Sequence, residues 1–169
     1  VNLAAGDAAA AFMSGRVDAA VVWNPWVNQI QQSGKGKPLF TSKDMPGLIP
    51  DLLVAQEKSI AANRKDFIGM IKAWYDVEKF IRDDPKAAAQ IMAKVVGLKA
   101  DEYQVFLPGT RFFGQKENLQ AFGPASDALS LLGVAPTIVG FLTENKLIEG
   151  RPDPAKGIDA SLVREVAKK

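Results

Sequence analysis

The start of the chain carries residues that can hold a small anion. Gly6, Asp7 and Ala8 stand at the head of a run of helix-forming residues. A helix start exposes backbone N–H groups and a partial positive charge, and a glycine there lets an anion approach the backbone closely. The plainer interpretation is a helix capped by Asp7, whose own negative charge repels an anion. Both interpretations stay open from the sequence.

Trp23, Asn24 and Trp26 form a second candidate group, at the end of an apolar run that predicts a buried strand. Open α/β sheets bind their ligands where such strands end. The Asn24 carboxamide can donate and accept hydrogen bonds, and indole rings can provide flat apolar walls. Core packing is the alternative for all three residues, and it is favoured for Trp26, which stands four residues before Ile30.

Asp51 and Arg111 are single charged candidates. Asp51 follows a proline-rich segment at 46–50, and it either lines a binding site or caps a rigid turn. Arg111 precedes two phenylalanines, and its planar guanidinium suits sulfonate or carboxylate oxygens, with a surface ion pair as the alternative. The glycine-lysine segment at 34–37 lacks the spacing of a phosphate-binding loop and predicts a solvated turn.

The composition argues against most catalytic chemistry. The 169 residues include no histidine and no cysteine, so the sequence has no Ser-His-Asp triad, no Cys-His pair, no disulfide and no usual zinc ligands. The 21 Lys and Arg against 19 Asp and Glu give a net charge of +2, and the two signs are interleaved, which does not indicate a nucleic-acid partner. We therefore expect no enzyme, no cofactor and no metal site.

The elements that must position these residues follow from periodicity and chain breakers. Short apolar runs at 1–3, 18–23, 39–41 and 52–55 predict strands, and a helix at 8–13 makes the first 23 residues β-α-β. After about residue 60 the pattern is helical. The longest predicted helix carries its apolar face from Phe67 to Ile81, and the next begins at Asp84-Pro85 and ends at Gly97. Further helices are predicted at 100–107, at 118–132 with an interruption at 123–124, at 136–145 and at 159–168.

The fold class predicted is thus α/β, with β-α-β at the N-terminus and a mostly helical C-terminal region. Three or four strands are few for an α/β domain of this length, which predicts that other strands of the same sheet lie outside these residues. Val1 falls in the middle of a predicted strand, so we expect a processed or shortened chain. No apolar run reaches 18 residues, and no signal peptide is present in this sequence.

Three segments together resemble one known family: GDAAA at 6–10, GRVDAAVVWNPW at 15–26 and PGLIPDLLV at 46–54. In this order and spacing they are similar to the C-terminal half of the substrate-binding proteins of ABC importers for nitrate, sulfonates, bicarbonate and taurine. The later FF at 112–113 and PDP at 152–154 follow the order of that family as well.

The resemblance implies part of a two-lobed periplasmic-binding-protein fold of type II, whose lobes close on a ligand. Residues 1–36 would end the second lobe, 37–55 would form the hinge crossover and a return strand, and 56–169 would be the helical part of the first lobe. It further implies a small-molecule ligand, an ABC permease in the membrane as partner, and a periplasmic or other extracytoplasmic location. Asn24 stands where amine-binding members often have an acid, which favours an anionic or neutral polar solute.

Two other functions stay open. The same scaffold resembles thiamine-pyrimidine synthases, which are enzymes, and the ligand-sensing domains of bacterial transcription regulators.

A chain of this composition without its full sheet is also expected to expose apolar surface and to self-associate.

Overall fold

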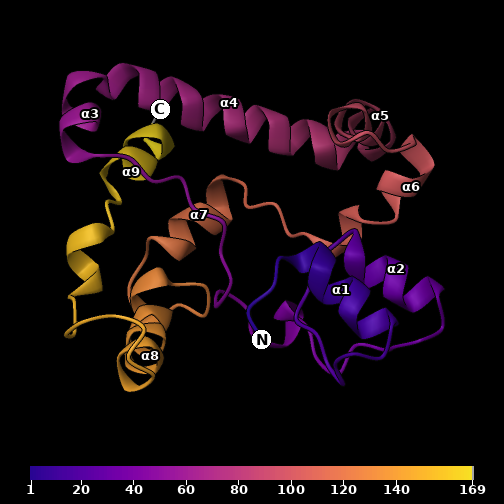
Figure 1. The fold of residues 1–169 in the computed structure, drawn as a ribbon. Coiled ribbons are helices and arrows are strands. Elements are labelled where there is room, and N and C mark those ends of the chain that lie inside the picture. The colour runs from indigo at the N-terminus through magenta and orange to yellow at the C-terminus, as the bar shows by residue number, and fades with distance from the viewer. Residues whose placement is uncertain (169) are drawn as a thin grey trace. The chain divides into compact units, whose positions relative to one another are not determined.

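The computed structural model describes residues 1–168, which are helices joined by irregular segments (Figure 1). The described part of the chain contains the following elements: α1 (Ala5–Met13), α2 (Trp26–Gln32), η1 (Ser42–Asp44), α3 (Glu57–Ala62), α4 (Arg64–Asp83), α5 (Pro85–Val96), α6 (Ala100–Gln104), η2 (Leu107–Gly109), α7 (Gln115–Ala121), α8 (Leu131–Glu144), η3 (Pro154–Gly157) and α9 (Ser161–Ala167).

The α/β prediction is wrong, because residues 1–168 contain no strand. The four runs at 1–3, 18–23, 39–41 and 52–55 have no regular secondary structure, and most of their apolar side chains are exposed, with Val21 at 89% and Val54 at 84%. A helix closes its hydrogen bonds within four residues, whereas a strand needs a neighbouring strand from elsewhere in the chain. None of the four runs has such a neighbour within the described residues, so the β-α-β unit does not form.

The local signals for helix ends are mostly confirmed. The Asp84 carboxylate accepts a hydrogen bond from Ala87 N at 3.0 Å, Pro85 is the first residue of α5, and Gly97 ends that helix in the left-handed region at φ 69°. The helix α4 is the longest in the described chain, with 20 residues. The prediction that Asp7 caps the first helix is wrong, because Ala4 is its N-cap and no side chain caps it.

The later helices differ in their bounds from the predicted ones. The region 100–107 divides into α6 and the short turn η2, which contains the proline of Leu107–Gly109. The region 118–132 is a helix only to Ala121, and the next helix, α8, begins at Leu131. The hydroxyl of the fully buried Ser130 accepts from Gly133 N at 3.3 Å and donates to Gly123 O at 3.1 Å, which fixes the start of α8.

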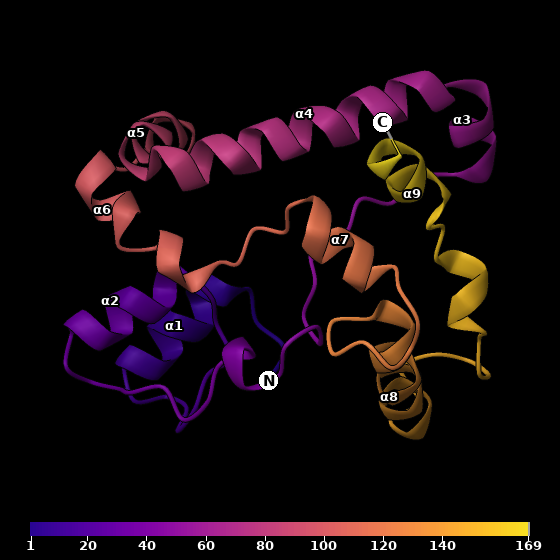
Figure 2. The ribbon, with the colours of Figure 1, turned by 180° about the vertical axis from the view of Figure 1, so that it is seen from behind.

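The chain divides into two compact units. The first consists of Val1–Thr41 and Asp84–Arg111, and the second of Ser42–Asp83 and the described residues from Phe112 onward. In the first unit α1 contacts α2 and lies beside it in both views, and α5 contacts α6 (Figures 1 and 2). These unit boundaries differ from the predicted boundaries after residues 36 and 55. A contact-based unit need not coincide with a lobe of the family fold, so the predicted lobe boundaries stay a prediction.

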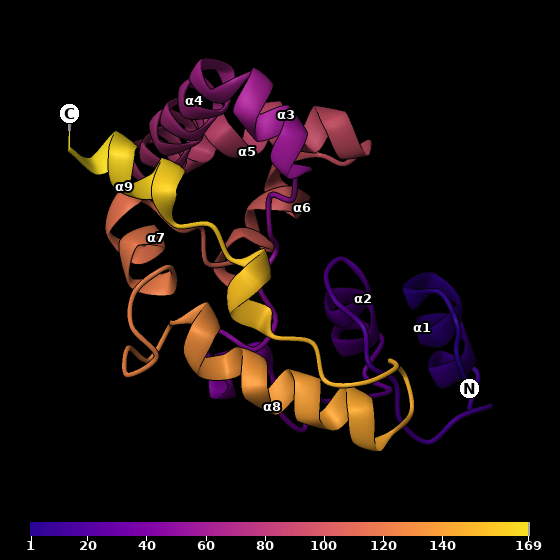
Figure 3. The ribbon, with the colours of Figure 1, turned by 90° about the vertical axis from the view of Figure 1, so that its left-hand side faces the viewer.

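The second unit is organised around α4. Helix α9 crosses the first half of α4, where Arg64 Nη2 lies 2.9 Å from Glu165 Oε2 and Arg64 Nε 3.1 Å from the same oxygen. Helix α7 contacts α9 as well, and η3 lies against α8 (Figure 3). Among the described helices, none combines the length and the apolar character needed to cross a membrane.

A close approach at Gly36 gives a stability prediction for the first unit. A Cβ at this position would lie 2.5 Å from Phe12 Cε1 and 2.8 Å from Ile30 Cγ2, and Ile30 is buried in α2. We expect Gly36→Ala to lower the free energy of unfolding by about 1–3 kcal/mol through overpacking. Urea unfolding measures this effect. Gly157→Ala, whose Cβ would meet nothing within 4 Å, is the control, and an equal loss in both variants would contradict the packing seen here.

Candidate functional site

Seven of the eight predicted site residues belong to the first unit. Asp51 alone belongs to the second, where it is exposed in the irregular segment before α3. Arg111 is also exposed, two residues after the end of η2. The first unit is therefore the place where the predicted residues can act together.

The start of α1 is a packing site rather than an open backbone surface. A Cβ on Gly6 would lie 3.0 Å from Trp26 Cζ2, so the indole of α2 lies directly on this glycine. Asp7, the third residue of α1, is exposed in its first turn. Its carboxylate adds negative charge where an anion would bind, and Ala8 offers only a methyl group. The structure thus gives Gly6 and Trp26 a role in joining α1 to α2, as the packing alternative for Trp26 predicts.

Trp23 and Asn24 lie in the irregular segment that leads into α2. Trp26 N donates to Trp23 O at 2.9 Å, which closes a tight turn around the cis Asn24-Pro25 peptide. The Trp23 side chain is 68% exposed, so its indole face is available to a ligand. Asn24 is half-buried, and its Nδ2 would lie 2.6 Å from a Cβ on Gly109. An apolar wall and a carboxamide are therefore adjacent in sequence and accessible.

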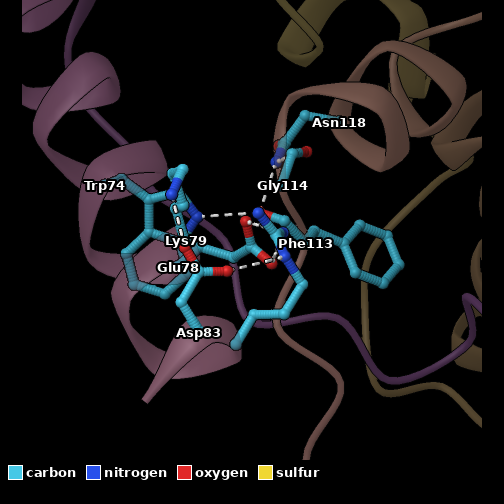
Figure 4. Close-up of polar contacts among 8 residues, drawn as sticks. Trp74, Glu78, Lys79, Asp83, Phe113, Gly114 and Asn118 are labelled. Atoms are coloured by element: carbon cyan, nitrogen blue, oxygen red, sulfur yellow. Dashed lines mark hydrogen bonds and ion pairs between the residues drawn. The ribbon is translucent and has the colours of Figure 1, made fainter. Parts of the chain in front are cut away.

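A polar cluster that sequence reasoning missed joins α4 to the segment before α7 (Figure 4). Trp74 Nε1 donates to Phe113 O at 2.9 Å, and Asn118 Nδ2 donates to the same oxygen at 3.0 Å and to Gly114 O at 3.0 Å. A Cβ on the buried Gly114 would lie 2.8 Å from Glu78 Oε2. The indole, the carboxamide and the missing side chain at 114 together hold this segment against α4.

Charged pairs along α4 complete the cluster. Arg82 Nη1 donates to both carboxylate oxygens of Glu78, at 2.7 and 2.8 Å, and the Glu78 side chain is only 13% exposed. Lys79 donates to Asp83, and this hydrogen bond lowers the pKa of the Asp83 carboxyl. The spacing of four residues between each acid and base was the signal available in the sequence. These hydrogen bonds and ion pairs all join groups of the chain itself, so we assign the cluster the role of a structural clamp.

The Tyr75 hydroxyl gives a second stability prediction. Its oxygen is buried without a hydrogen-bond partner among the described residues, and burial raises the pKa of this phenol. Tyr75→Phe removes the unsatisfied group, so we expect unchanged or increased stability at pH 7, by up to about 1 kcal/mol.

The same raised pKa fixes the sign of the pH dependence. The folded state holds the phenolic proton of Tyr75 more tightly than the unfolded state does. The resulting contribution to the free energy of unfolding is therefore complete below the unfolded pKa of about 10 and is lost as pH rises above it. Tyr75→Phe should therefore lose less stability than the wild type between pH 9 and 11 in urea unfolding. A loss as steep as that of the wild type would contradict the assignment.

A shallow pocket in the second unit contains none of the predicted residues. It has a volume of about 200 Å³ and is lined by Pro136, Val139, Arg151, Pro152 and Pro154. This is smaller than typical small-molecule sites, which begin near 300 Å³. Within residues 1–168 no group of three Asp or Glu side chains lies close enough to hold a metal ion.

The family comparison agrees with the resemblance carried by segments 6–10, 15–26 and 46–54. A family model described as NMT1-like matches residues 1–97, which is more than half of the chain. The chain therefore belongs to the NMT1-like family, a family of ABC substrate-binding proteins of the nitrate, sulfonate and taurine type. At the level of the family, this places it among solute-binding proteins that serve importers. No curated protein and no solved structure matches the chain.

Proposed function

We propose that this chain binds a small anionic or neutral polar solute, such as nitrate, a sulfonate or a taurine-like compound, for an ABC importer. It does so by binding alone, without catalysing a reaction. The observation that carries the proposal is the family match over residues 1–97, which contains seven of the eight predicted site residues.

The binding site is centred on Trp23 and Asn24. The exposed indole offers an apolar wall, and the carboxamide offers one donor group and one acceptor group. An uncharged asparagine, rather than an acid, favours an anionic or neutral solute over an amine. The first turn of α1 is left out of the site, since Trp26 lies on Gly6 and Asp7 carries the wrong charge for an anion.

The family supports a proposed location and partner. Its members are importer substrate-binding proteins, so we place the chain outside the cytoplasm, where it delivers its solute to an ABC permease. The absence of a suitable membrane-crossing helix in residues 1–168 neither adds to this placement nor opposes it.

A thermal-shift screen tests the proposal. The protein is melted with nitrate, bicarbonate, ethanesulfonate, taurine, an aromatic carboxylate and a pyrimidine, because a ligand at about 100 times its Kd adds about 2.7 kcal/mol of stability. We expect one chemical class to raise the Tm. Asn24→Ala and Trp23→Ala should remove that rise, and Asn28→Ala, on α2, should keep it. No rise with any of the six, or a rise that survives both site substitutions, would contradict the proposal.

A further inference from the structure

Gly109 lies against the side chain that the proposed site depends on. The two residues are 85 positions apart in sequence, and both belong to the first unit. A Cβ built on Gly109 would lie 2.6 Å from Asn24 Nδ2, and the next nearest atom is Asn24 Cγ at 3.9 Å. The space that any side chain at 109 would need is therefore taken by the Asn24 amide nitrogen.

The backbone at Gly109 is held in place. Gly109 N donates to Phe106 O at 2.9 Å, and Thr110 N donates to Leu107 O at 3.1 Å, so η2 is a closed 3₁₀ turn. Upstream, the rings of Tyr103 and Phe106 meet edge to face at 6.1 Å. The turn would thus hold a Cβ at 109 in place, and the Asn24 side chain would have to move to make room for it.

Moving the Asn24 amide would cost little folding stability but would weaken the recognition of a solute. Only the tip of a flexible side chain stands in the way, since no backbone atom outside the chain neighbours and the turn itself lies within 4 Å of the built Cβ. The amide nitrogen would have to move by about 1 Å to reach ordinary van der Waals contact. A hydrogen bond to a solute tolerates only about 2.7–3.2 Å between donor and acceptor, so such a displacement breaks it.

We infer that Gly109 is a positioning residue, whose missing side chain keeps the Asn24 carboxamide where it can meet a solute. The inference rests on the proposed function, because it gives Asn24 a ligand. The backbone itself does not require glycine here, because φ at Gly109 is not in the left-handed region and would accept alanine. Apart from the turn itself, the group that a side chain at 109 would meet is the Asn24 carboxamide.

The test uses Gly109→Ala in the full chain, followed through the side-chain ¹H–¹⁵N signals of Asn24, which are assigned by their loss in Asn24→Ala. We expect those two signals to shift while the backbone spectrum away from residues 24 and 109 is kept. Gly140→Ala, whose Cβ would meet nothing within 4 Å, is the control and should leave the Asn24 signals in place. Unshifted Asn24 signals in Gly109→Ala overturn the inference whether or not a ligand is known.

A double variant distinguishes an effect on the Asn24 side chain from an effect on the stability of the turn itself. In an Asn24→Ala background the space at 109 is empty, so adding Gly109→Ala should leave the Tm unchanged. If Gly109→Ala lowers the Tm as much in the Asn24→Ala background as in the wild type, the glycine is needed for the turn itself and the inference is wrong.

Measurements of the Kd distinguish a failure of the inference from a failure of the proposed function. For the probes of the screen that bind the wild type, ethanesulfonate or nitrate among them, Gly109→Ala should raise the Kd about tenfold, the loss of one hydrogen bond to the solute. A shifted Asn24 signal with an unchanged Kd overturns the inference and leaves the proposed function standing. If the wild type binds no probe, the proposed function fails, and the Asn24 signals and the double variant still decide whether Gly109 positions that side chain.

Discussion

At micromolar concentrations the 169-residue chain is expected to form dimers or larger assemblies. Its accessible surface is 12102 Å². Even two separate domains with the sizes of its two units, making no contact with each other, would expose only about 9,800 Å² in total. The excess of about 2,300 Å² per chain, doubled in a pair, falls within the range of obligate homodimer interfaces.

The composition of the core points the same way. Ten apolar residues in the described chain are buried, and six of them are alanines. Larger apolar side chains are at the surface instead, including Leu53 at 64% and Phe40 at 66% exposed. Because hydrophobic stabilisation grows with the area removed from water, we expect these side chains to favour contact with a second copy of the chain.

Light scattering after size exclusion, from 1 to 100 µM, measures this association. We expect a mass of at least twice 18.2 kDa at the upper end. Val54→Lys should weaken association about tenfold by placing a charge on the exposed run 52–55. Gln56→Lys adds the same charge at an exposed polar position two residues later and is the matched control. A monomer at all concentrations, with one cooperative melt, would contradict the prediction.

Trp74→Ala is expected to give the largest loss of stability in the second unit, about 2–3 kcal/mol. The indole donates to Phe113 O and packs against Phe112, with ring centres 6.4 Å apart. It is 44% exposed, so the loss is smaller than the roughly 3–5 kcal/mol typical of a fully buried tryptophan. Trp74→Phe keeps an aromatic ring but loses the hydrogen bond and a small part of the packing area, and should cost about 1 kcal/mol.

Urea unfolding of the variants provides the measurement, with Trp23→Ala as the matched control. Trp23 is 68% exposed, so its removal should cost less than about 1 kcal/mol. If the two tryptophan-to-alanine changes cost the same, the clamp of α4 on the segment before α7 does not contribute to stability, and the assignment of that cluster is wrong.

The helices could be predicted from sequence because their determinants are local. Asp84, Pro85 and Gly97 set the bounds of α5 through hydrogen bonds and dihedral angles within a few residues. Asp7 was misassigned for a related reason: it stands near a helix start, but the helix begins earlier, after Ala4. A helix start can move by a turn when several small residues precede it, since each alanine among them is a good helix former.

The strands could not be predicted in the same way. An apolar run such as 52–55 shows that its residues favour burial, but the hydrogen bonds of a strand must come from another strand, and none is present within residues 1–168. The pattern therefore showed only that these residues favour burial. Whether they form strands depends on neighbouring strands, which the pattern of a single run does not reveal.

For the site, the sequence alone determined the residue types, the lack of histidine and cysteine, and the family, because these are properties of the chain read in order. Only the tertiary structure decided that Trp26 lies on Gly6, that the Glu78 carboxylate lies against Gly114, and that the Asn24 amide lies where a side chain on Gly109 would be. Each of these contacts joins residues between 20 and 85 positions apart. Contacts at that separation depend on how whole elements pack, which no local pattern specifies.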